Sequence, residues 1–277
     1  MIPVLFLNTL FCSLIFLPAV IATTLGIFEN DHMLYAPTQG WDVQKYIILK
    51  SFIVLSSWLL GYVGIKHIPL TIVGPINATR PVWALLGALL IFGERLSLLQ
   101  WIGVLTALLS FFLLSKSGKK EGIDFRRDKW IVCLVFSAIL GAISGLYDKY
   151  LMAPAENGGV GLNRMEVQAW YNIYQCLWMG LMLELLWLPT RKKSTPFHWS
   201  WCILGISLFL SVADFAYFYA LSLEGAMISV ISMARRSSVL VSFVFGAMVF
   251  KEKNLKSKAI DLALVLLSMI FLWLGSH

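Results

Sequence analysis

The sequence has few charged residues for its length. Charged side chains make up 13% of its 277 residues, whereas soluble domains carry about 25%. Hydrophobic residues account for 59% of the chain. This composition excludes a domain whose whole surface faces water, and it predicts that the lipid bilayer surrounds most of the protein.

The sequence also has few residues that bind metals or form disulfides. The four cysteines lie inside apolar segments and show no CxxC spacing, so we expect them to be small buried residues: Cys12, Cys133, Cys176 and Cys202. The four histidines are scattered, and their spacing builds no metal cluster. We therefore expect no metal and no cofactor.

The sequence around Ser144 superficially resembles that of an intramembrane serine protease. No helix supplies the histidine base that Ser144 would need as a nucleophile, so we do not expect an enzyme.

Basic residues exceed acidic ones, and the net charge is +7. They lie mainly in short loops between apolar runs, which is the orientation signal of membrane proteins and not the pattern of a nucleic-acid surface. We expect a protein embedded in the cytoplasmic membrane, with the basic loops inside and no nucleic-acid partner.

Apolar runs of membrane-spanning length recur along the whole chain. Each has the roughly 20 residues that a bilayer core requires, which predicts an all-α integral membrane protein with nine transmembrane helices. A basic linker, 116–129, separates a first part, 1–115, from a second part, 130–277. The nine runs are 1–27, 45–66, 70–93, 97–115, 130–152, 165–189, 198–222, 226–250 and 257–275.

The two parts of the chain are similar to each other. Phe92 and Glu94 of the first part align with Phe250 and Glu252 of the second, and the apolar residues that follow keep the same spacing. The alternating spans make the two parts enter the membrane from opposite faces, which predicts inverted repeats. The partner of helix 130–152 falls before residue 1. Either the first repeat lacks its first helix, or the protein starts further upstream.

One stretch carries a family motif. Pro81 precedes the hinge Gly93-Glu94-Arg95, and Gln100-Trp-Ile-Gly103 follows it. This pattern resembles the EamA-type transporters of the drug/metabolite transporter superfamily. In the second part, Lys251-Glu252-Lys253 stands at the hinge, Val239 replaces the proline and Asp261 replaces the glycine.

The resemblance implies a fold and a function. The family has ten helices in two five-helix inverted repeats around a central cavity, so this chain would be that fold without its first helix. Its members are permeases for small metabolites. We expect the hinges to involve Pro75, Pro81, Glu94 and Glu252.

Three arginines lie deep inside apolar runs: Arg80, Arg235 and Arg236. An arginine at the bilayer centre costs about 2.5–3.5 kcal/mol, so it faces a partner or a wet cavity. By the resemblance, their helices line the cavity. Since guanidinium groups match carboxylates and phosphates, we expect an anionic group on the substrate. Asn77 and Asn172 are further candidates for binding it.

The acidic residues suggest a second role. Asp214 lies at a depth similar to that of Arg235, so it is a candidate for an ion pair with Arg235 or Arg236, or for proton coupling. Asp148 lies near the end of its helix, and we expect it at the membrane interface. Asp214 would then be the only well-buried carboxylate.

These observations predict a permease for a small polar metabolite, anionic or zwitterionic, that works by alternating access at a midplane cavity between the repeats. Two alternatives remain open. One is a flippase for a phosphate-bearing lipid carrier. The other is a non-transporting membrane partner subunit. A homodimer also remains open.

Overall fold

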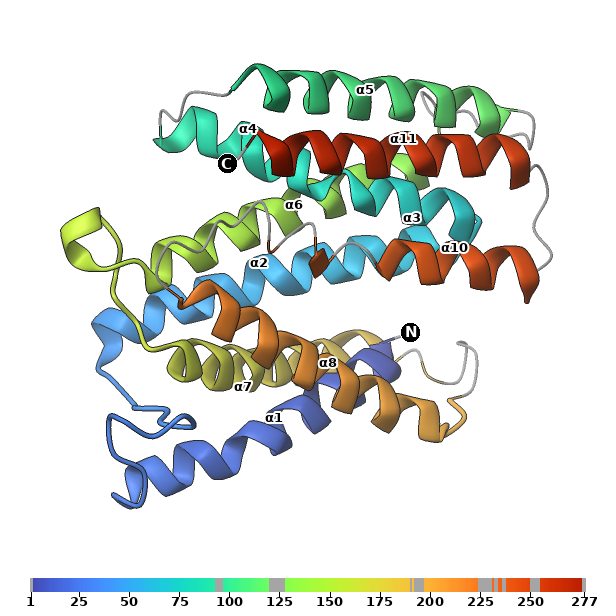
Figure 1. Ribbon diagram of the computed structural model, residues 1–277. Helices are drawn as coiled ribbons and strands as arrows, with labels where there is room; N and C mark the ends of the chain where they lie inside the picture. Colours follow the sequence, from blue (N-terminus) through green and yellow to red (C-terminus); the bar gives the residue numbers. More distant parts are fainter. Residues whose placement is uncertain are drawn as a thin grey trace. The chain divides into compact units, whose positions relative to one another are not determined.

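The computed structural model describes residues 2–92, 97–119, 128–189, 191, 197–223, 231, 234–235, 238–249 and 255–275 (Figure 1). Every regular element among these residues is a helix. In chain order the helices are α1 (Ile2–Thr24), α2 (Trp41–Ile65), α3 (Leu70–Ala78), α4 (Arg80–Phe92), α5 (Leu98–Lys119), α6 (Lys129–Met152), the 3₁₀ turn η1 (Ala155–Asn157), α7 (Arg164–Met182), the π turn η2 (Leu183–Trp187), α8 (Trp201–Leu221), α10 (Ser238–Met248) and α11 (Leu255–Leu274).

Four of these helices are long and apolar enough to cross a membrane: α1, α2, α6 and α8. Two shorter apolar helices, Leu98–Leu114 and Ala259–Leu274, lie within α5 and α11. The described residues therefore support a helical membrane protein, and the arrangement of nine spans in inverted repeats stays a prediction.

The apolar run 70–93 forms two helices and not one. The first, α3, ends at Ala78, and α4 begins at Arg80. Pro81 has no N–H to donate to the preceding turn, which weakens the helix at this point. The hydroxyl of Thr79 donates to the Ile76 carbonyl (2.7 Å) and accepts from Trp83 Nε1 (3.1 Å), so the side chain at the junction has its own partners.

The chain divides into two compact units. Unit 1 comprises Met1–Leu55 and Tyr147–Ala226, and unit 2 comprises Ser56–Leu146 and Met227–His277. The helices α2 and α6 each contribute residues to both units. These units group the chain differently from the predicted repeats 1–115 and 130–277, which remain a prediction.

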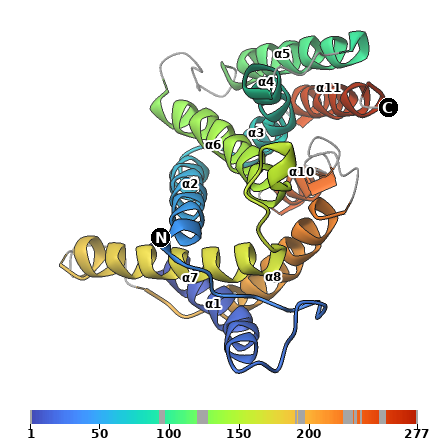
Figure 2. The same ribbon diagram turned by 90° about the vertical axis from the view of Figure 1, so that its left-hand side faces the viewer.

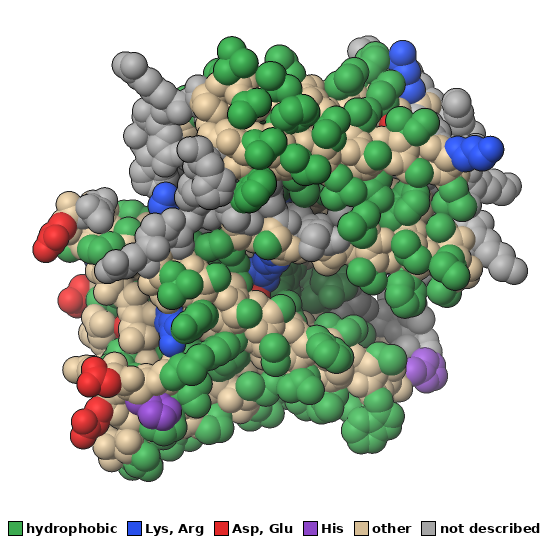
Figure 3. All heavy atoms as spheres, viewed as in Figure 1, with side chains coloured by type: hydrophobic (Ala, Val, Ile, Leu, Met, Phe, Trp, Pro, Cys, Tyr) green, Lys and Arg blue, Asp and Glu red, His purple; other side chains and the backbone are tan. Residues whose placement is uncertain are grey.

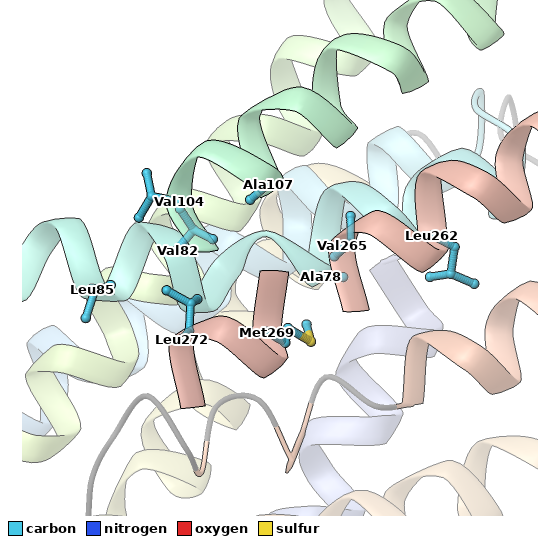
Figure 4. Close-up of a cluster of buried hydrophobic side chains, with 9 residues drawn as sticks. All are labelled: Ala78, Val82, Leu85, Val104, Ala107, Leu262, Val265, Met269 and Leu272. Carbon is cyan, nitrogen blue, oxygen red and sulfur yellow. The ribbon is translucent and has the colours of Figure 1, made fainter. Parts of the chain in front are cut away.

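The core of unit 2 forms where α5 packs along α11 and α3 packs against α10 and α11. Figure 4 shows its buried apolar side chains, which come from α3, α4, α5 and α11: Ala78, Val82, Leu85, Val104, Ala107, Leu262, Val265, Met269 and Leu272. Gly103 allows the close approach of α5 and α11, because a Cβ there would lie 3.0 Å from the Ser268 carbonyl oxygen. The hydroxyl of Ser110 donates to the Asp261 carbonyl (2.7 Å) across the same contact.

The core of unit 1 forms where α1 packs against α7 and α8 (Figure 2). Phe16 and Val20 of α1 meet Met165 and Ala169 of α7. The N-cap Asn163 begins α7 by accepting a hydrogen bond from the Met165 N–H (2.8 Å).

The helices of unit 1 bury polar residues and expose apolar ones. In α8, Phe209 is 77% exposed whereas Asp214 is 4% exposed. In α1, Asn8 is buried while Leu14 and Ile21 are exposed. Figure 3 shows hydrophobic side chains over much of the visible helix surface. This polarity is expected of helices that face lipid, because only the protein interior offers hydrogen-bond partners there.

Candidate functional site

Unit 1 contains a buried ion pair between Lys50 of α2 and Asp148 of α6. Lys50 is 2% exposed and Asp148 is 3% exposed. Asp148 is therefore enclosed by the protein, and its expected position at the membrane interface stays a prediction. Asp214 is also not the only well-buried carboxylate, because Asp148, Glu166 and Asp261 are buried as well.

Tyrosines hold the two helices together around this ion pair. The hydroxyl of Tyr147 donates to the Tyr46 carbonyl (3.3 Å), and the rings of Tyr46 and Tyr150 lie 6.5 Å apart. Tyr46 is one turn before Lys50, and Tyr147 and Tyr150 flank Asp148 in the sequence. These contacts therefore bring the lysine and the aspartate into register.

Aromatic residues of α7 and α8 surround the ion pair. The Nζ atom of Lys50 lies 4.9 Å from the ring centroid of Tyr171 and 5.2 Å from that of Phe218, so both rings stabilise the cation. The Tyr217 hydroxyl donates to Asp148 Oδ2 (3.2 Å). The Tyr171 hydroxyl donates to Asp214. We call Lys50, Asp148, Tyr171, Asp214 and Tyr217 the lysine cluster.

A second polar site lies in unit 2 around Arg80, the first residue of α4. Its Nη2 donates to the Ser137 hydroxyl of α6 (3.4 Å). Gly141, one turn further along α6, makes room for the guanidinium, because a Cβ there would lie 2.6 Å from Arg80 Nη1. Ser137 is itself held in place, since its hydroxyl donates to the Ser57 carbonyl (2.7 Å) and the Ser57 hydroxyl donates back to the Ser137 carbonyl (2.8 Å).

This arginine site has unused hydrogen-bonding capacity. Among the described residues, neither Arg80 Nε nor Asn77 Oδ1 has a hydrogen-bond partner. Arg235 lies close enough for its positive charge to act on Arg80. Two neighbouring arginines and an unused donor are suited to an anion. We call Arg80, Ser137, Asn77 and Arg235 the arginine site.

The predicted site residues fall in different parts of the structure. Arg80, Asn77, Arg235, Pro75 and Pro81 belong to unit 2. Asn172 and Asp214 belong to unit 1, where the Asn172 amide donates to the Gln168 carbonyl (2.8 Å). Arg236, Glu94 and Glu252 lie outside the described residues. The pairing of Asp214 with Arg235 or Arg236 remains a prediction.

Sequence reasoning missed most of the lysine cluster. Lys50 and Asp148 each lie inside an apolar helix and carry opposite charges, which was the available signal. Ser137 had no signal of its own, because serines are common in membrane helices and bond to their own backbone.

Comparison with known protein families supports the resemblance. Residues 1–116 match the EamA-like transporter family. The resemblance is confirmed for this segment. Together with the apolar helices, this match indicates an integral, multi-pass membrane protein.

The chain is similar in fold to solved structures. Among 23 matching chains, one titled "Crystal structure of protein" has a TM-score of 0.61 and 16% sequence identity, with 98% of this chain and 88% of that chain covered. At this identity the likeness concerns the fold alone. No curated protein matches the chain.

Proposed function

We propose that this EamA-like protein is a permease for a small polar metabolite with a carboxylate or phosphate group, either anionic or zwitterionic. The observation that carries the proposal is the environment of Arg80. Its guanidinium is held by one hydroxyl, that of Ser137, and no carboxylate pairs with it among the described residues. An arginine inside a membrane helix is costly unless a partner or a polar cavity receives it, and a substrate anion is such a partner.

The geometry of Arg80 suits recognition of an anion. The Nη2 atom is fixed by Ser137, while Nε is a buried donor whose partner would come from outside the described residues. A guanidinium offers its N–H groups in a planar fork that matches carboxylate and phosphate oxygens. Arg235 adds a second positive charge, which increases the attraction for an anion. Asn77 Oδ1 would accept a hydrogen bond from a substrate N–H or O–H group.

The break between α3 and α4 fits the same role. Discontinuous helices in transporters carry substrate sites near the bilayer midplane, and Arg80 is the residue at which α4 begins. We propose that nine spans form two inverted repeats in the cytoplasmic membrane. The substrate would reach Arg80 by alternating access, as the helices open to one side and then to the other.

The test is ligand-induced stabilisation of the purified protein. A ligand that binds the native state raises the melting temperature in a concentration-dependent way. Carboxylates or phosphates should stabilise the wild type, and Arg80→Ala should abolish the effect. Arg80→Lys should weaken it, because a lysine keeps the charge but loses the fork. Arg164→Ala is the matched control, since Arg164 packs on the Tyr219 ring in unit 1.

Other outcomes would refute the anion site or favour a different function. Stabilisation only by cations, or an unchanged response in Arg80→Ala, would refute the anion site. Stabilisation by phosphate-bearing lipids but by no free anion would favour a flippase over a metabolite permease.

A further inference from the structure

One face of α7 in unit 1 carries a row of amide side chains that the arginine site does not use. Gln168, Asn172 and Gln175 follow one another at helical spacing, so they lie on the same side of the helix. Gln168 and Gln175 are 0% exposed, and Asn172 is 4% exposed. Tyr171, on the same side of α7, donates a hydrogen bond to Asp214 of α8. The row therefore lies inside unit 1.

The protein satisfies only part of the hydrogen-bonding capacity of this row. Gln168 Nε2 donates to the Ser211 backbone carbonyl (3.4 Å), and Asn172 Nδ2 donates to the Gln168 backbone carbonyl (2.8 Å). Among the described residues, Gln168 Oε1, Gln175 Oε1 and Gln175 Nε2 have no hydrogen-bond partner. Because both polar atoms of Gln175 are unused, this holds whichever way its amide is turned. Buried polar groups are nearly always hydrogen-bonded, so these atoms call for a partner from outside the chain.

The unused atoms favour a neutral ligand over an ion. A cation would bind the two amide oxygens and leave the N–H groups of Gln175 without a partner, and an anion would do the reverse. A hydroxyl group can donate to an amide oxygen and can also accept from an amide N–H. Hydroxyl groups therefore satisfy both kinds of unused atom.

The spacing of the row favours a ligand with several hydroxyl groups. Gln168 and Gln175 are two turns apart on α7, which is about 10 Å along a helix axis. A single hydroxyl or carboxamide group would reach only one of them. A molecule with hydroxyl groups on successive carbon atoms can bind both ends of the row.

We propose that unit 1 binds a neutral polyhydroxylated molecule, a sugar or a sugar alcohol, through Gln168 and Gln175. The Gln175 amide donates to one hydroxyl oxygen and accepts from a second hydroxyl. Gln168 Oε1 accepts from a hydroxyl further along the ligand. The site uses no residue of the arginine site and no charged group, so either proposal can fail without the other.

The experiment measures the melting temperature of the purified full-length protein in detergent with millimolar myo-inositol, D-mannitol or D-glucose. Trimethylamine N-oxide is the reference, because it stabilises proteins through exclusion from their surface but carries no hydroxyl group. The rise in melting temperature with at least one polyol should saturate, whereas the reference should give no saturating rise. Gln168→Leu should increase the half-saturating concentration by up to about tenfold, because one neutral hydrogen bond is lost.

Gln175→Leu separates the proposed ligand site from a purely structural amide. Without ligand, this variant should melt at least as high as the wild type, because leucine replaces a buried amide that has no partner. Its saturating response to the polyol should be lost. Gln39→Leu is the matched control in unit 1, since the Gln39 amide already donates to Glu166 Oε2 (2.9 Å). Its polyol response should persist.

Three results would overturn the proposal. The first is the absence of a saturating response to all three polyols, checked by equilibrium dialysis of the wild type against the tritiated compounds. The second is an unchanged polyol response in Gln175→Leu. The third is a lower melting temperature of Gln175→Leu without ligand, which would show that the amide already has a partner such as a buried water molecule.

Discussion

Replacing Lys50 by methionine removes the ammonium group from a buried ion pair. Both Lys50 and Asp148 are almost fully enclosed, so the carboxylate that stays behind has little access to water. Breaking one side of a buried ion pair costs about 3–5 kcal/mol. The lost contacts of the ammonium with the Tyr171 and Phe218 rings add about 0.5–2 kcal/mol each. Uptake of a proton by Asp148 would offset part of this sum, so we expect a net loss of stability of about 3–5 kcal/mol.

The double replacement Lys50→Met with Asp148→Leu tests the reason for this loss. Replacing both members of a buried pair by apolar residues of similar volume is often neutral or stabilising. The double variant should therefore be more stable than Lys50→Met alone. The coupling energy in the double-mutant cycle should reach about 2–3 kcal/mol.

The measurement is equilibrium unfolding of the reconstituted protein, followed by tryptophan fluorescence or by circular dichroism. Lys45→Met is the matched control, because Lys45 lies on the same helix but is exposed and contacts only the Tyr46 ring among the described residues. Lys45→Met should lower the free energy of unfolding by less than about 1 kcal/mol. Two results would show that Lys50 and Asp148 do not form an energetically coupled pair. One is a loss of stability in Lys50→Met no larger than that in Lys45→Met. The other is a double variant whose loss of stability equals the sum of the losses in Lys50→Met and Asp148→Leu.

Three further predictions follow from glycines. Gly103→Ala should destabilise the protein by about 1–3 kcal/mol, measured by the same unfolding method, because the new Cβ would lie 3.0 Å from the Ser268 carbonyl oxygen. Gly205→Ala, with nothing within 4 Å of the added Cβ, should instead be neutral or stabilise by up to about 1 kcal/mol. Gly141→Ala should push the Arg80 guanidinium aside, so anion binding measured by melting temperature should weaken more than overall stability does. An unaltered anion response in Gly141→Ala would argue against the described position of Arg80.

The sequence predicted the helical class of this protein but not every helix. Long apolar runs with few charges leave no alternative to membrane helices, and α1, α2, α6 and α8 lie where such runs were found. The run 70–93 was different. Its prolines indicated a kink, yet the end of α3 at Ala78 also involves the hydrogen bonds of Thr79 with Ile76 and Trp83, and an apolar pattern does not specify such bonds.

The sequence singled out Arg80 as a candidate site residue but not Lys50 or Asp148. Arg80 was found because a charge near the middle of an apolar run has few explanations. Lys50 and Asp148 lie nearer to helix ends, where long or polar side chains commonly reach the interface. Only the pairing of two residues 98 positions apart shows that both are buried. Such a pairing depends on how α2 and α6 pack, which one sequence does not contain.

The buried polar groups can be sorted by whether the protein satisfies them. Lys50 and Asp148 satisfy each other, and such a pair stabilises one arrangement of helices without needing a ligand. Arg80 Nε and Gln168 Oε1 lack hydrogen-bond partners among the described residues, although they lie where an unpaired polar atom is costly. A membrane protein can keep such an atom unpaired where a bound ligand supplies the missing hydrogen bond. The unsatisfied atoms are therefore better guides to ligand sites than the charges themselves, and Arg80 Nε is the reason for proposing an anion at the arginine site.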